Sequence, residues 1–99
     1  MARLTWSVTA RRDLRSIKQY VAFDSPRAAE FLVERIINVA KRLEDFPDLG
    51  RVVPGFNDDS LRELIYENYR IVYRIRARGP SIVRVVHSAM DIRRVEFGA

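Results

Sequence analysis

Cysteine is absent from this 99-residue chain, and histidine occurs once, at His87. Without cysteine there is no disulfide, no thiolate ligand for a metal and no thiol nucleophile. A zinc site would have to combine the single histidine with carboxylates. We therefore expect neither a bound metal nor a cofactor.

Long apolar runs are also absent. No segment approaches the roughly 20 apolar residues that a membrane span requires, and residues 1–7 lack the apolar stretch of a secretory signal. We expect a cytoplasmic protein with no membrane partner. The length suits one domain, residues 1–99, in which roughly two-thirds of the unfolded surface becomes buried.

Lysine is scarce. Sixteen of the eighteen basic residues are arginine, and thirteen acidic residues leave a net charge of +5. A basic surface favours nucleic acid, ribosomes or acidic proteins as partners, and the arginine fork pairs with phosphate or carboxylate at two points. Genomic base composition explains the arginine excess equally well. The positions of the arginines have to decide between these explanations.

The first elements expected are a short strand at residues 3–7 and a helix that begins at Ser7 or Thr9. Alternating apolar residues predict the strand. Apolar residues at helical spacing predict the helix, and they are Ala10, Leu14, Ile17 and Val21.

A second helix is expected over residues 24–45. Asp24 or Ser25 can accept hydrogen bonds from its first amides, and Pro26 fits the first turn because its missing N–H costs nothing there. Only a few residues separate the two helices, so we expect an antiparallel hairpin.

The second half of the chain predicts a loop followed by a sheet. Residues 47–60 are rich in turn-forming residues. Runs rich in β-branched and aromatic residues follow, with short connections that imply antiparallel neighbours; they cover residues 61–66, 69–76 and 82–87. Residues 88–99 suit a half-turn or an edge strand. The fold class is α+β: an N-terminal strand, an antiparallel helix hairpin and a three-stranded antiparallel meander forming one sheet.

The run 69–76 alternates between two kinds of residue. Tyr69, Ile71, Tyr73 and Ile75 share one face, and Arg70, Val72, Arg74 and Arg76 share the other. We expect the first face to be core and the second to be cationic. Arg62 and Arg84 on the flanking strands widen the cationic face if the strand register places them there.

Several motifs resemble those of the RelE/ParE superfamily of bacterial toxins, and of its ParE branch in particular. The segment Phe46 to Pro54 is similar to the loop FPxxGRxVP of that branch, Arg62-Glu63-Leu64 to its R-E-L strand, and Tyr69 to Arg74 to its YRIxYR strand. The resemblance spans nearly the whole chain and agrees with the order of elements expected above.

This resemblance implies a toxin of a type II toxin–antitoxin system. A cognate antitoxin, usually acidic, would neutralise it in a heterotetramer or a higher complex. ParE-like members inhibit DNA gyrase, whereas RelE-like members are ribosome-dependent endoribonucleases that cleave mRNA. We expect a gyrase inhibitor, which is not an enzyme. The alternatives are a metal-independent endoribonuclease of the RelE type and a decayed toxin that only binds its antitoxin.

The residues needed for RelE-type cleavage are only partly present. Arg70 matches the arginine that clamps phosphate in RelE-like nucleases, and His87 is the one natural acid–base group. The RelE type also relies on lysines near the sheet and a tyrosine near the C-terminus, but both lysines lie on expected helices and Phe97 stands in the tail. Glu63 and Glu67 suit salt-bridge or solvated roles.

For binding the target or the antitoxin we select four arginines of the sheet. They are Arg62, Arg70, Arg74 and Arg84. If the protein is a nuclease, Arg70 and His87 are the catalytic candidates.

Overall fold

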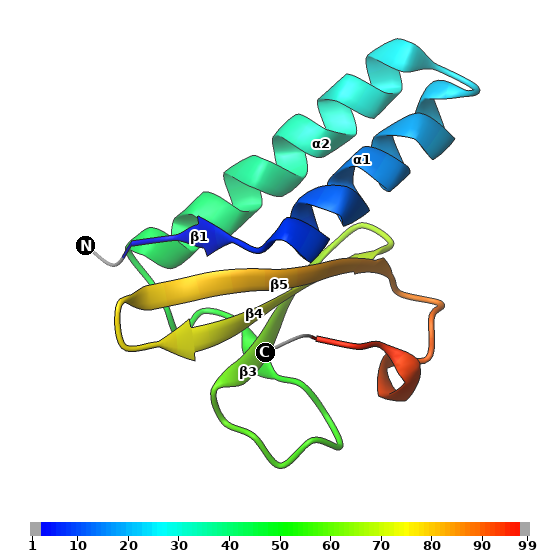
Figure 1. Ribbon diagram of the computed structural model, residues 1–99. Helices are drawn as coiled ribbons and strands as arrows, with labels where there is room; N and C mark the ends of the chain where they lie inside the picture. The colour runs from blue at the N-terminus through cyan, green and yellow to red at the C-terminus, as the bar shows by residue number, and fades with distance from the viewer. Residues whose placement is uncertain (1–2, 98–99) are drawn as a thin grey trace.

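The computed structural model describes residues 3–97, and these form two layers (Figure 1). Two helices lie together on one face of a five-stranded sheet. In chain order the elements are β1 (Thr5–Trp6), α1 (Val8–Ala22), α2 (Pro26–Lys41), η1 (Arg42–Glu44), β2 (Arg51–Val52), β3 (Leu61–Tyr66), β4 (Tyr69–Arg76), β5 (Gly79–His87) and η2 (Ile92–Arg94).

Serine side chains begin both helices. Ser7 Oγ accepts a hydrogen bond from the Ala10 amide at 3.0 Å, and Ser25 Oγ accepts one from the Ala28 amide at 3.2 Å. Each serine therefore satisfies one of the amides that a helix leaves unpaired at its start. The helix hairpin expected from the sequence is confirmed, and the 3₁₀ turn η1 carries helical structure to Glu44.

The sheet has the strand order β1-β5-β4-β3-β2. The antiparallel meander of β3, β4 and β5 is confirmed. The structure adds a neighbour for the predicted N-terminal strand, since β1 pairs in parallel with β5. One feature differs from the expectation: a further strand, β2, lies inside the segment predicted as a loop. Both pairings involve only two residues per strand, which is too short to produce a periodic sequence pattern.

The main core lies between the helices and the sheet. Ile71 and Tyr73 of β4 are completely buried there, and the partly buried Tyr69 and Ile75 pack against the same cluster. Ala10 and Leu14 of α1 and Ile36 and Ala40 of α2 cover them. This arrangement confirms the predicted core face of residues 69–76.

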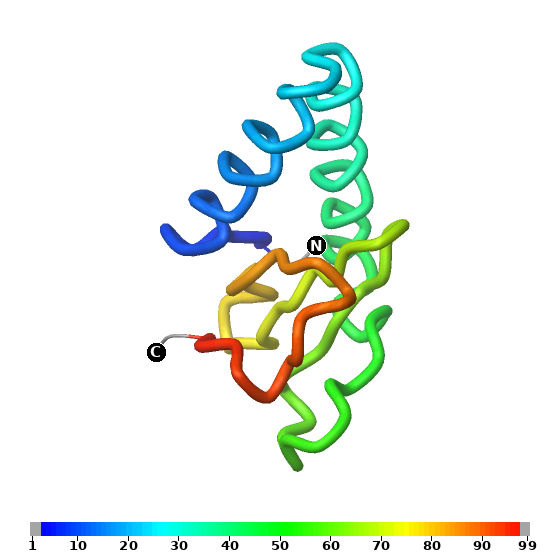
Figure 2. The backbone as a smooth tube through the Cα atoms, turned by 90° about the vertical axis from the view of Figure 1, so that its right-hand side faces the viewer, coloured from blue at the N-terminus to red at the C-terminus, as the bar shows by residue number. Residues whose placement is uncertain are grey.

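The other face of the sheet is not simply cationic, as the alternation had suggested. Val72 is fully buried in a second apolar cluster with Val53, Leu61 and Val83. The loop before β3 and the segment after β5 cover this face, on the side of the strands away from the helices (Figure 2), and they contribute Phe56, Ile92 and Phe97. The expectation failed because residues outside the strands supply the cover.

Within residues 3–97, neither helix combines the length and apolarity that would allow it to cross a membrane.

Candidate functional site

Strand register decides which of the predicted arginines share a surface. Arg74 pairs with Leu61, Arg70 with Ile65 and Arg84 with Val72, so these three arginines lie on the face away from the helices. Arg62 pairs with Tyr73 and therefore lies on the helix side of the sheet. The structure thus brings three of the four arginines to one face and separates Arg62 from them.

Arg70 is held by a buried carboxylate. The Glu63 side chain is inaccessible to solvent; its Oε1 lies 3.4 Å from Arg70 Nη1, and its Oε2 accepts from Arg51 Nε at 2.7 Å. The Arg51 side chain is 59% exposed and the Arg70 side chain 20% exposed. The salt-bridge role predicted for Glu63 is confirmed, whereas sequence reasoning missed Arg51 because the short strand β2, to which it belongs, was not recognised.

Arg74 pairs with Asp58 of the preceding loop at 2.7 Å. Asp58 Oδ1 also accepts from the hydroxyl and the amide of Ser60, at 2.7 and 3.0 Å. Hydrogen bonds from Ser60, then the bond and charge of Arg74, lower the pKa of Asp58 from 3.8 to about 2. This carboxylate therefore stays ionised and keeps Arg74 paired well into the acidic range.

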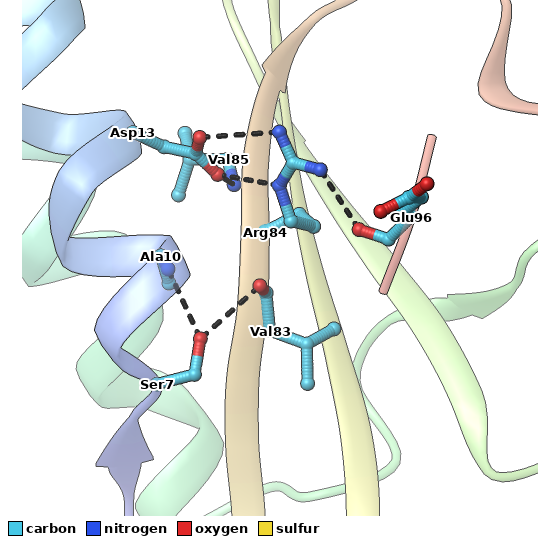
Figure 3. Close-up of polar contacts among 7 residues, drawn as sticks. All are labelled: Ser7, Ala10, Asp13, Val83, Arg84, Val85 and Glu96. Carbon is cyan, nitrogen blue, oxygen red and sulfur yellow. Dashed lines mark hydrogen bonds and ion pairs between the residues drawn. The ribbon is translucent and has the colours of Figure 1, made fainter. Parts of the chain in front are cut away.

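Arg84 connects three parts of the chain (Figure 3). It donates to both carboxylate oxygens of Asp13 in α1, at 2.9 and 3.2 Å, and its Nη1 donates to the backbone oxygen of Glu96 at 2.8 Å. Asp13 also accepts from the Val85 amide at 2.9 Å. The guanidinium that was expected to contact a partner thus fastens α1 and the C-terminal segment to β5.

Arg62 fixes the loop that resembles the FPxxGRxVP motif. Its Nε donates to the Asp59 backbone oxygen at 3.0 Å, and its Nη1 donates to the Gly50 oxygen at 3.1 Å. The Tyr73 hydroxyl holds the same loop from the core, donating to the Pro47 oxygen at 2.7 Å and accepting from the Gly50 amide at 2.9 Å. Sequence reasoning identified Tyr73 only as a core residue.

Close packing explains the glycine of this loop. A Cβ atom at Gly50 would lie 2.6 Å from Tyr73 Cε1 and 2.7 Å from the Glu63 backbone oxygen. Burial raises the pKa of Tyr73 above its ordinary value of 10.0, so its hydroxyl remains protonated and able to donate at neutral pH.

His87 lies on a different surface from Arg70. It pairs with Tyr69, on the helix side of the sheet, and the two rings meet edge to face with centroids 5.6 Å apart. The Nδ1 atom of His87 accepts from the Ala89 amide at 3.0 Å. The imidazole borders an open depression that Ser16, Ile17 and Tyr20 of α1 also line. The structure therefore does not bring the two predicted nuclease residues together.

In the part of the chain that the structure describes, no three histidine, aspartate or glutamate side chains gather in a group that could hold a metal ion.

Within residues 3–97, the motif residues singled out in the sequence, such as Gly50, Arg62 and Tyr73, thus have identifiable contacts in a fold of two helices and a five-stranded sheet. Residues 4–92 match the family described as the ParE toxin of the type II toxin–antitoxin system parDE. The chain belongs to the ParE toxin family.

Curated relatives and a solved structure agree with membership of the ParE family. The chain is 33% identical to Toxin RelE2 of Caulobacter vibrioides, over 90% of this chain and 98% of that protein. It is 38% identical to the putative toxin Y4kP of Sinorhizobium fredii, over 87% of this chain and 88% of that protein. A structure of the chromosomal ParDE system from P. aeruginosa matches with a TM-score of 0.74 and 26% identity, over 88% and 96% of the two chains.

Proposed function

We propose that this ParE-family toxin inhibits DNA gyrase without catalysing a reaction. The separation of Arg70 from His87 across the sheet is the observation that supports this proposal most directly. Phosphodiester cleavage without a metal needs an acid–base group within hydrogen-bond reach of the reacting oxygens, next to the cation that binds phosphate. The carboxylate beside Arg70 belongs to Glu63, which is buried and already paired with two arginines.

A cognate antitoxin is the second part of the proposal. Tyr20 and Phe23 at the end of α1 are 82% and 93% exposed, and Tyr20 also borders the depression beside Tyr69 and His87. Exposed aromatic groups of this kind favour a protein partner. The solved ParDE structure concerns a toxin–antitoxin system, so we propose that an antitoxin covers this surface, in a heterotetramer or a higher complex in the cytoplasm.

The decisive experiment measures supercoiling of a relaxed plasmid by gyrase in the presence of the purified toxin. We expect inhibition that the antitoxin relieves. We also expect His87→Ala to retain inhibition, because the proposed mechanism uses no acid–base group. Unimpaired supercoiling at toxin concentrations well above those of gyrase would refute the proposal.

A ribosome-dependent endoribonuclease is the second candidate function. The name of the Caulobacter relative, Toxin RelE2, and the partial exposure of Arg70 favour it. This activity predicts cleaved mRNA on translating ribosomes and its loss in both Arg70→Ala and His87→Ala. A toxin that inhibits gyrase and leaves mRNA intact would exclude it.

A further inference from the structure

A concave site lies at the end of the sheet where the β4–β5 hairpin meets the start of the chain. It has a volume of about 440 Å³ and is lined by Arg3, Thr5 and residues 76–79 of the hairpin. Figure 1 shows the hairpin turn and the start of β1 at the same end of the sheet. His87 stands at the opposite end of β5, roughly 26 Å away at the usual rise of a strand. The concave site is therefore separate from the surfaces described above.

Backbone geometry brings three arginines to this site. The parallel pairing of Thr5 with Ser81 sets Arg3 beside the start of β5. Gly79 has a φ of +129°, and a Cβ atom there would clash with the Arg3 backbone, including its nitrogen at 2.8 Å. A glycine therefore allows the two segments to come this close. Arg76 pairs with Gly79 across the hairpin, and Arg78 occupies the turn between them.

The described residues that line this site include cationic side chains. None of these lining residues, all within residues 3–97, is acidic. Across residues 3–97, neither Arg3 nor Arg78 forms a salt bridge, whereas Arg70, Arg74 and Arg84 each face a carboxylate. Three guanidinium groups around one concavity repel one another and attract an anion. Because arginine presents two parallel donors, phosphate matches this arrangement well.

We infer that Arg3, Arg76 and Arg78 form a binding site for a phosphate group of a nucleic-acid backbone. The side chains at positions 76–78 are exposed, so a polymer can reach the site as readily as a free ion. The site does not depend on the proposed gyrase inhibition, since gyrase and ribosome complexes both contain nucleic acid. It adds a direct contact between the toxin and that nucleic acid.

The first experiment titrates the full-length toxin with inorganic phosphate and follows backbone and arginine Nε–H resonances by NMR. We expect saturable shifts at Arg3 and at residues 76–81. The double variant Arg3→Gln/Arg78→Gln should lose them. The control Arg11→Gln/Arg12→Gln removes the same charge from exposed positions of α1 and should keep them. Thermal unfolding of both variants checks that each remains folded.

The second experiment measures binding of a labelled DNA duplex by fluorescence anisotropy at several salt concentrations. Each phosphate contact contributes about 0.9 to the slope of log K against log salt. Because the inferred site holds one phosphate group, we expect Arg3→Gln/Arg78→Gln to reduce the slope by about 0.9, and the α1 control to reduce it by less than half as much.

Two results would overturn the inference. Equal losses in the two variants would mean that overall charge, rather than this site, binds DNA. Saturable phosphate shifts at the site with an unchanged DNA slope would mean that it takes a small anion only. Neither measurement contains gyrase, so a failure of this inference is distinguishable from a failure of the proposed inhibition.

Discussion

Asp13 and Arg84 join the first helix to the last strand across 71 positions of sequence, with two hydrogen bonds of 2.9 and 3.2 Å. Both side chains are more than four-fifths buried. Asp13 also accepts from the backbone amide of Val85, which belongs to a part of β5 that β1 does not reach. One carboxylate therefore satisfies both a guanidinium and a backbone amide of β5 that β1 leaves unpaired.

Replacing Asp13 should destabilise the protein markedly. Asp13→Ala leaves the Arg84 guanidinium and the Val85 amide without their acceptor, and hydrogen bonds to charged groups contribute about 1.5–3 kcal/mol. We expect a loss of about 2 kcal/mol in the free energy of unfolding, measured by urea denaturation. Asp13→Asn keeps an acceptor for Val85 and should lose less. If the losses in the free energy of unfolding caused by Asp13→Ala and by Arg84→Ala are additive in the double variant, the pairing of the two side chains contributes no stability.

The raised pKa of Tyr73 leads us to expect a loss of stability at alkaline pH. Burial raises its pKa above 10.0, so the folded state retains a proton that the unfolded state releases. The stabilisation is complete below pH 10 and decreases as pH rises through the folded-state pKa. We expect the urea midpoint to fall above pH 10, and this fall to be smaller in Tyr73→Phe.

The same substitution should also lower stability at neutral pH. Tyr73→Phe leaves the buried Gly50 amide without its acceptor, which costs about 1–3 kcal/mol. An unchanged urea midpoint at pH 7 would show that this hydroxyl does not hold the loop.

Removing the two partners of the Arg51–Glu63 pair should have unequal effects. Glu63→Gln removes the buried charge, and Arg51 is exposed enough to be solvated by water. Arg51→Gln instead leaves the inaccessible carboxylate with Arg70 at 3.4 Å as its remaining charged partner. A buried charge that loses its partner costs more than an exposed one. We expect Arg51→Gln to lower the free energy of unfolding more than Glu63→Gln does, and the reverse order would contradict this account.

The lowered pKa of Asp58 leads us to expect a loss of stability in acid. Its pKa is lowered from 3.8 to about 2 in the folded state, so its contribution is complete above the unfolded value and decreases as pH falls from about 4 to about 2. NMR titration of the Asp58 carboxyl group should give the lowered pKa directly. In Asp58→Asn the urea midpoint should depend less on pH over this interval, with Asp59→Asn as the neighbouring control.

Local sequence patterns predicted the elements well because each pattern reports a feature of its own segment. The apolar spacing of α1 and the alternation in residues 69–76 both reflect burial against one layer. The two-residue strands β1 and β2 depend on partners far away in sequence. Their pairing has no local signature, which is why β2 was missed and β1 had no predicted neighbour.

The candidate site was harder to predict for the same reason. The sequence shows that arginines gather on the sheet strands, but it does not show which of them meet carboxylates. Asp13 and Asp58 come from a helix and a loop, and the fold brings them to Arg84 and Arg74. Arg3 and Arg78, which were not selected as binding residues from the sequence, form no salt bridge in the part of the chain described.

The position of β5 between β1 and β4 also governs the order in which the chain can assemble as it is synthesised. Thr5 and Trp6 find their partners only when residues 81 and 82 have been made, and Asp13 finds its partners at residues 84 and 85. At typical synthesis rates of about 5–20 residues per second, several seconds pass between the synthesis of the helix hairpin and the synthesis of β5, the strand that anchors it. A nascent chain that ends before β5 therefore contains the helices of the toxin without the assembled fold.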